Sequence, residues 1–104
     1  MKITIQDKLM EYLHEHEYKI IKLKLVHEDY SVGNVYSKRP IISYHEPNHL
    51  ERYDRYEIDD IVVYIQKGIK AKNDHIEFIF EKLLGKHSCH VKGVELDKMP
   101  SETG

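Results

Sequence analysis

Histidine is the residue type whose number and spacing most suggest chemistry in this sequence. The 104 residues include eight histidines but only one cysteine, Cys89. Histidine changes charge near neutral pH and is the commonest metal ligand in proteins. On a regular strand His87 and Cys89 project from the same face, whereas His90 projects from the opposite face. A strand can therefore present His87 together with Cys89, but not Cys89 together with His90, to one metal ion.

The remaining histidine spacings do not suggest a metal site. His14 and His16 fall in a predicted helix, where two residues correspond to a rotation of about 200°, so their side chains diverge. His45 and His49 are four residues apart, but Pro47 lies between them and argues against a regular helix. Each lone histidine is therefore interpreted as a solvated surface residue, although His45 and His49 could still converge in a loop.

Cys89 has two interpretations that the sequence leaves open. It shares its predicted strand face with Val91, which favours a small buried apolar side chain. The alternative is a reactive or metal-binding thiol beside His87. A single cysteine excludes an intrachain disulfide and any multi-cysteine metal site within one chain. It is also compatible with the cytosol, where we expect the protein to be located.

Composition and motifs exclude several other classes of function. Lysine plus arginine number 16 against 18 acidic residues, which gives a net charge of −2. The chain therefore lacks the excess of basic residues that a protein binding a polyanion needs. We therefore expect no nucleic-acid partner. No apolar run reaches the length of about 18 residues that a membrane span needs, and the first residues do not form a signal peptide. No glycine-rich phosphate loop or nucleophile elbow is present, so we expect no enzymatic activity.

Hydrophobic periodicity predicts a mainly β (α+β) domain with one N-terminal amphipathic helix. Ile5, Leu9 and Leu13 recur every fourth residue and define a helix over residues 6–16, which a capping box of Thr4 and Asp7 would start. Alternating patterns predict strands over 1–5, 19–26, 41–44, 76–80 and 87–96, and a hairpin of 56–58 with 61–65. Residues 27–38 have no clear period, and residues 81–85 resemble one helical turn closed by glycine.

These elements predict short, mostly antiparallel strands in a curved sandwich or barrel on which the helix packs. A slip in apolar parity between Val91 and Val94 suggests a bulge at Gly93. Residues 97–104 are expected to form a flexible tail after a single domain of residues 1–96. The predicted core consists of Ile5, Leu9, Leu13, Leu23, Leu25, Val63, Ile65, Phe78, Phe80 and Val91.

The order of these features resembles the HesB/IscA-like family, the A-type carriers of iron–sulfur assembly. It is closest to a small branch of that family that carries a Cys-Cys or Cys-selenocysteine pair. The resemblance runs from a Met-Lys-Ile-Thr-Ile start, through the helix ending in Glu-Tyr-Leu and the acidic-turn hairpin of residues 53–65, to Val-Lys-Gly-Val-Glu-Leu at residues 91–96. It implies a HesB-like domain over residues 1–96.

The cysteines of the family are missing from this sequence. The branch's pair should lie near Val32-Gly33-Asn34, and the Cys-x-Cys near the C-terminus of A-type carriers is also absent. No family ligand position can therefore be transferred to this chain. Because an iron–sulfur cluster needs several thiolates, we do not expect a stable cluster within the monomer.

The resemblance implies a non-enzymatic protein related to iron–sulfur assembly or metal binding, with a degenerate cysteine site. Its metal ligands would be His27, Asp29, His87 and Cys89, and the metal would be iron or another divalent transition metal held by histidine and carboxylate groups. A protein partner in metal or cluster handling, or a homodimer, would fit this role. The alternative is a metal-free interaction module or homodimer that uses the tyrosine-rich hairpin around Tyr53 and Tyr56.

Overall fold

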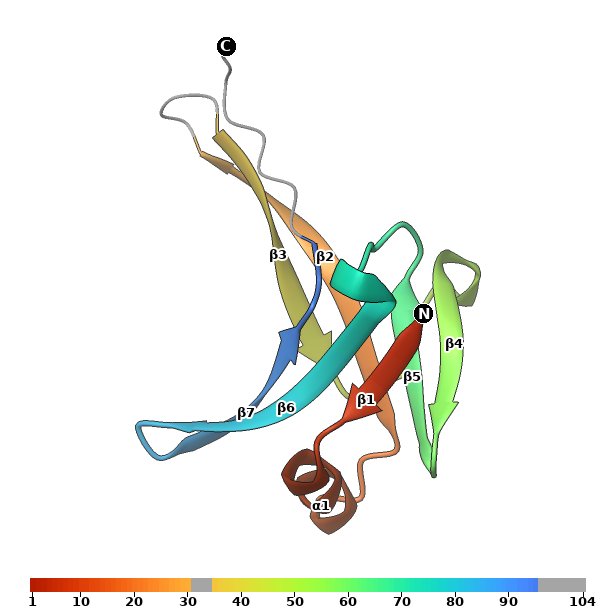
Figure 1. The fold of residues 1–104 in the computed structure, drawn as a ribbon, viewed down its shortest axis with the longest axis vertical. Helices are drawn as coiled ribbons and strands as arrows, with labels where there is room; N and C mark the ends of the chain where they lie inside the picture. The colour runs from red at the N-terminus through yellow and green to blue at the C-terminus, as the bar shows by residue number, and fades with distance from the viewer. Residues whose placement is uncertain (31–34, 96–104) are drawn as a thin grey trace.

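The computed structural model describes residues 1–30 and 35–95, which form two mixed β-sheets and one helix (Figure 1). One sheet has the strand order β1-β6-β7, and the other has the order β3-β2-β5-β4. The elements are β1 (Lys2–Ile5), α1 (Asp7–Glu15), β2 (Ile20–Tyr30), β3 (Val35–Ser43), β4 (Tyr53–Ile58), β5 (Ile61–Gln66), β6 (His75–Leu83) and β7 (Lys86–Lys92), with 3₁₀ turns η1 (Leu50–Arg52) and η2 (Lys72–Asp74).

Each sheet contains one parallel pair of strands, β1 with β6 and β2 with β5. A glutamine side chain extends each of these pairs by one hydrogen bond. The Phe80 amide donates to Gln6 Oε1 at 2.8 Å, and the Leu25 amide donates to Gln66 Oε1 at 2.9 Å. The pairs β2–β3, β4–β5 and β6–β7 are antiparallel. The predicted mainly β fold is confirmed, as two separate sheets and not one closed sheet.

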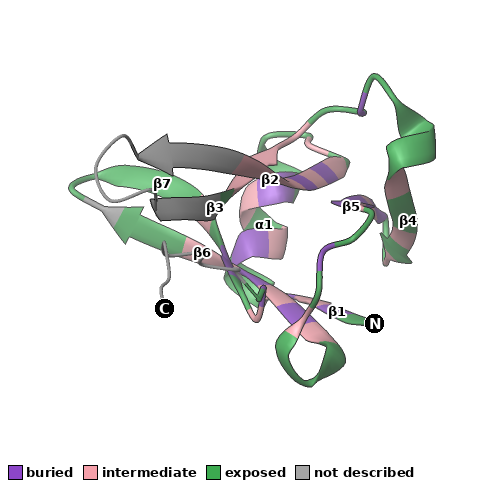
Figure 2. Ribbon diagram, turned by 90° about the horizontal axis from the view of Figure 1, so that it is seen from above, coloured by how far each residue is buried: buried purple, intermediate pink, exposed green. Residues whose placement is uncertain are grey.

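The core lies between the two sheets and under α1 (Figure 2). Leu9 and Leu13 of the helix are fully buried, as the fourfold spacing predicts. Eight of the ten predicted core residues are buried, and the other two, Leu25 and Phe80, are half-buried against the core. The prediction omitted several residues that are also buried: Ile3, Ile21, Ile61, Tyr64, Ile69, Ile76 and Val94.

Two regions in which the sequence predicted no strand form β-hairpins instead. Residues 81–85 are not a helical turn, because β6 continues to Leu83 and pairs with Lys86 across a two-residue turn. Leu84 and Gly85, with φ of 52° and 79°, both have the positive φ of a tight hairpin turn. Likewise β2 and β3 pair along their lengths as far as Tyr30 and Val35, so most of residues 27–38 is hairpin. Cross-strand pairing overrides weak local periodicity in both places.

The predicted details at α1 and Gly93 were also wrong. The helix begins after Gln6, which provides no side-chain cap, and Thr4 Oγ1 is instead hydrogen-bonded to His75 Nε2 at 2.8 Å. Gly93 does not form a bulge within a strand. Strand β7 ends at Lys92, the chain bends at Gly93 with φ of +93°, and Val94 bridges to Ala71. The predicted tail, residues 97–104, lies outside the described residues, as does Leu96.

No helix among the described residues is long and apolar enough to cross a membrane.

Candidate functional site

A groove of about 310 Å³ lies where the edge strands of the two sheets, β3 and β7, approach each other. Figure 1 shows these two strands crossing near the middle of the molecule. The groove is lined from one side by Pro40, Ile42 and Tyr44, from the other by residues 87–91 of β7, and at one end by Tyr12 of α1.

Pairing of β7 with β6 determines which side chains face the groove. Cys89 pairs with Phe80 and Val91 pairs with Phe78, and both phenylalanines pack in or against the core. Because directly opposed residues of an antiparallel pair share a face, Cys89 and Val91 also face inward. His87 is two residues before Cys89 and therefore lies on the same face. The expectation that His87, Cys89 and Val91 share one face is confirmed.

Burial along this face decreases from Val91 to His87. Val91 is buried, Cys89 is half-buried and His87 is exposed. Loss of solvent raises the pKa of the Cys89 thiol from 9.0 to about 12. The thiol is therefore protonated at neutral pH, whereas a nucleophile or metal ligand must be a thiolate. These features support the interpretation of Cys89 as a small side chain packed against the core.

Six aromatic rings form a continuous chain along the helix end of the groove. Tyr44 stacks on Tyr18 with ring centroids 4.5 Å apart and an interplanar angle of 6°. His16 stacks on Tyr18 at 5.6 Å and lies 4.2 Å from Tyr12. Tyr12 continues to Phe80 at 5.2 Å, and Phe80 to His87 at 5.1 Å. Sequence reasoning missed this cluster, for which the count of eight tyrosines was the available signal.

The Tyr44 hydroxyl belongs to the same electrostatic environment as the thiol. Burial is the main cause that raises the pKa of Tyr44 above its ordinary value of 10.0, and the proximity of Cys89, Tyr12 and Tyr18 raises it further. The groove therefore presents uncharged thiol and phenol groups at neutral pH. Such groups can donate hydrogen bonds to a bound partner, but they supply neither a base nor an activated nucleophile.

His87 lies between this groove and a second hollow of about 540 Å³ beside α1. Tyr12 and His87 line both spaces, and the second is otherwise lined by Lys8, Glu11, Glu15, His16 and Phe80. The Tyr12 carbonyl lies 3.0 Å from His16 Nδ1, so the His16 ring donates a hydrogen bond there. The His87 ring contacts Tyr12 edge-on with centroids 6.2 Å apart.

The four predicted metal ligands are described only in part. His87 and Cys89 lie as stated above. The backbones of His27 and Asp29 belong to β2 and pair with Lys38 and Tyr36, but their side chains lie outside the described part of the structure. Where side chains are described, no three His, Cys, Asp or Glu residues converge on one point. The set His27, Asp29, His87 and Cys89 therefore stays a prediction.

The fold and groove define a small protein of two mixed sheets and one helix, with its single cysteine at the groove. A family model described as the CC/Se motif containing family matches residues 1–94, and the chain belongs to that family. This agrees with the Cys-Cys or Cys-selenocysteine branch indicated by the sequence. No curated protein and no solved structure matches the chain.

The chain lacks the motif after which its family is described. Cys89 is its single cysteine, so no Cys-Cys pair is present. The expected place of the pair, near Val32-Gly33-Asn34, falls in residues 31–34, which connect β2 to β3 and lie outside the described residues.

Proposed function

We propose that this chain is a non-enzymatic, HesB/IscA-like protein that acts beside iron–sulfur assembly or metal handling, with a degenerate cysteine site. The observation that carries the proposal is that Cys89, half-buried against the core, is the single cysteine of a chain whose family is described by a paired motif. Iron–sulfur clusters are held by several thiolates, and one neutral thiol does not supply them. The proposal includes a cytoplasmic location, which the single cysteine supports.

In this proposal the groove between β3 and β7 receives a protein partner in metal or cluster handling. Half-buried aromatic rings and the exposed rings of His16 and His87 at its helix end favour such contacts, because aromatic side chains provide large rigid surfaces with a polar tip. Any metal ion would be iron or another divalent transition metal bound through His87 with the carboxylate and imidazole of Asp29 and His27.

The test begins with protein purified without a histidine tag and analysed for metal and for visible absorbance. After anaerobic reconstitution with iron and sulfide, we expect no stoichiometric cluster to survive desalting. Any bound divalent ion should be lost in His87→Ala but retained in His90→Ala, because His90 is on the opposite face of the same strand. A cluster that survives both desalting and Cys89→Ala would refute the proposal.

A second candidate function is a metal-free interaction module or homodimer that uses the tyrosine-rich hairpin. It is favoured by the position of β4 at the edge of its sheet and by the partial exposure of Tyr53 and Tyr56. Edge strands carry unpaired backbone groups that can pair with another chain. This candidate predicts no bound metal and concentration-dependent self-association in sedimentation, which Tyr56→Ala should weaken. A monomer that binds iron or zinc would exclude it.

A further inference from the structure

A third hollow, of about 200 Å³, lies on the outer face of the four-stranded sheet, away from the groove. Its lining residues come from β2, from the end of β5, and from the segment that contains η1. Described residues that line it include no carboxylate, although acidic residues outnumber basic ones in the chain. The lining consists of Lys22, Lys24, Asn48, His49, Arg52, Tyr53 and Gln66.

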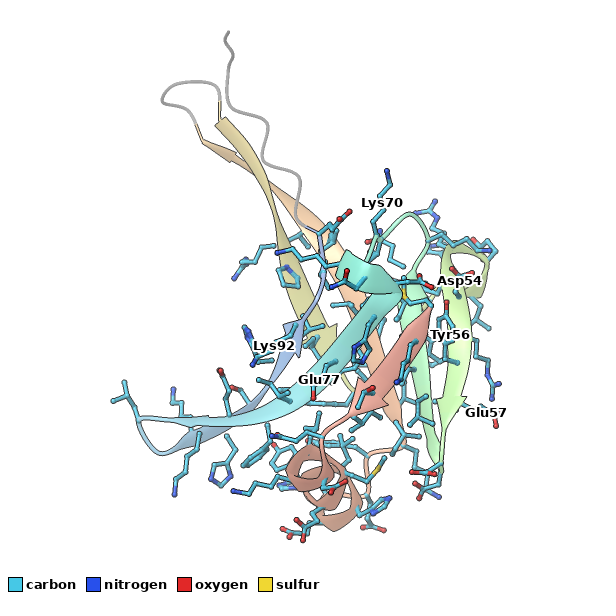
Figure 3. All side chains as sticks on the ribbon, in the orientation of Figure 1. Asp54, Tyr56, Glu57, Lys70, Glu77 and Lys92 are labelled. Atoms are coloured by element: carbon cyan, nitrogen blue, oxygen red, sulfur yellow. The ribbon has the colours of Figure 1, made fainter. Side chains whose placement is uncertain are left out.

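Among the described residues, none of the cross-strand partners of the two lysines in the hollow is acidic. Lys22 and Lys24 are half-buried and two residues apart on β2, so they project from one face about 7 Å apart. Across the sheet, Lys22 lies opposite Ser43 and Tyr64, and Lys24 lies opposite Ile41. By contrast, Lys92 on the other sheet lies opposite Glu77 (Figure 3).

Arg52 likewise forms no ion pair with an acid in the part of the chain that the structure describes. Among the described residues, the ion pairs use other cations, such as Arg55 with Glu57 and Lys67 with Asp54, and none involves Lys22, Lys24 or Arg52. Glu51 lies beside the lining, and its carboxylate is 3.6 Å from Nδ1 of His49. Three positively charged side chains therefore line one hollow, and none of the three is ion-paired with an acid among the described residues.

Backbone hydrogen bonds hold the hollow in shape. The Arg52 amide donates to the His49 carbonyl at 3.0 Å, and the Arg52 carbonyl accepts from the Lys67 amide at 2.9 Å. Gln66 Oε1 accepts from the Leu25 amide, which leaves the two N–H donors of the Gln66 amide for another acceptor. The hollow thus combines a fixed frame, three cations and spare amide donors.

We propose that this hollow binds a single phosphate group, either as inorganic phosphate or as part of a small phosphorylated metabolite. Arginine matches phosphate with two parallel hydrogen bonds, and lysine adds a point charge. A volume of 200 Å³ lies below the range of roughly 300–1,000 Å³ of pockets for drug-sized ligands, which favours one small oxyanion. The site lies on a different face from the groove and does not depend on the proposed function above.

The test titrates the full chain with sodium phosphate and follows backbone amide shifts by NMR, against sodium chloride at equal ionic strength. We expect saturable shifts at the hollow with phosphate alone. Lys24→Gln and Arg52→Gln should each weaken binding about tenfold, because each removes a charge-assisted hydrogen bond. Lys92→Gln is the matched control and should leave the affinity unchanged. Arg52→Lys keeps the charge but should still weaken binding, because lysine cannot form the paired contact.

Further ligands distinguish the sources of the phosphate group. Tighter binding of glycerol phosphate or adenosine monophosphate than of inorganic phosphate would identify a metabolite site, and the reverse order would identify inorganic phosphate. Equal shifts with chloride, or the same affinity in Lys24→Gln and Arg52→Gln as in Lys92→Gln, would overturn the proposal. Binding of single-stranded oligonucleotides that strengthens with their length would overturn it as well, in favour of a polyanion surface.

Discussion

Cys89 should react with a thiol reagent much more slowly in the folded protein than in denaturant. Its side chain is half-buried on the inner face of β7, opposite Phe80. Burial raises its pKa from 9.0 to about 12, and the thiolate is the form that attacks. The reaction of the native protein should therefore be limited by the small thiolate population.

The size of the effect follows from the two pKa values. At pH 8, a rise from 9.0 to about 12 lowers the thiolate fraction about a thousandfold. A more basic thiolate is also a better nucleophile, with a Brønsted coefficient of about 0.4–0.5, and this recovers about half of the loss on a logarithmic scale. The native rate should therefore be at least about 30-fold below the denatured rate, before restricted access slows it further.

An aromatic disulfide reagent measures this rate directly, because the single cysteine gives one absorbance signal. A parallel urea titration should show that Cys89→Ser lowers the free energy of unfolding by about 1–2 kcal/mol, since it buries a hydroxyl without a partner. Cys89→Ala should lower it less. Native labelling within about threefold of the denatured rate would contradict the burial argument. If zinc or iron also suppressed that labelling, Cys89 and His87 would be metal ligands.

Three further predictions concern stability. Gly93→Ala should lower the free energy of unfolding by at least about 2 kcal/mol in urea, because φ is +93° and an added Cβ would lie 2.3 Å from the His75 carbonyl oxygen; a neutral result would mean that the bend relaxes. Ser43→Ala should be neutral or raise the free energy of unfolding by up to about 1 kcal/mol, because the buried Ser43 hydroxyl has no hydrogen-bond partner among the described residues. A clear decrease in the free energy of unfolding would show that the hydroxyl has a partner. The free energy of unfolding should fall as pH rises from about 9 toward 12, because the unfolded chain loses the proton of Cys89 before the folded chain does. From about pH 10 the unfolded chain also loses the proton of Tyr44 first, which adds to the fall. In melting curves, Cys89→Ala should make this fall less steep.

Local periodicity in the sequence was sufficient to predict which side chains share a face, because this depends on backbone geometry alone. The alternation of side chains along a strand is set by the extended backbone, so the shared face of His87, Cys89 and Val91 was predictable. The helical stripe of Leu9 and Leu13 was predictable for the same reason, with 3.6 residues per turn in place of two. Neither inference requires knowledge of the neighbouring strands.

The incorrect predictions fall where pairing partners decide the conformation. Residues 81–85 combine a leucine-rich run with a glycine, which locally resembles the end of a helix. In the structure β6 and β7 pair throughout that region, and the glycine serves a tight turn. Thr4 was assigned to cap α1 because of its spacing to Asp7, but its hydroxyl instead meets His75 of β6. Such partners are distant in sequence, and no local pattern identifies them.

Both candidate sites depend on contacts that only the tertiary structure supplies. Tyr12 comes from the helix, Tyr44 directly follows the edge strand β3, and Cys89 comes from the last strand. They meet because the two sheets bury their apolar faces against each other. The phosphate hollow likewise requires η1 to fold over the outward face of β2. The sequence determined which residues face inward along each strand. Packing between distant segments decides how closely the two sheets approach each other. It therefore also decides how far burial raises the pKa of Cys89, because the exclusion of solvent depends on all the surrounding atoms.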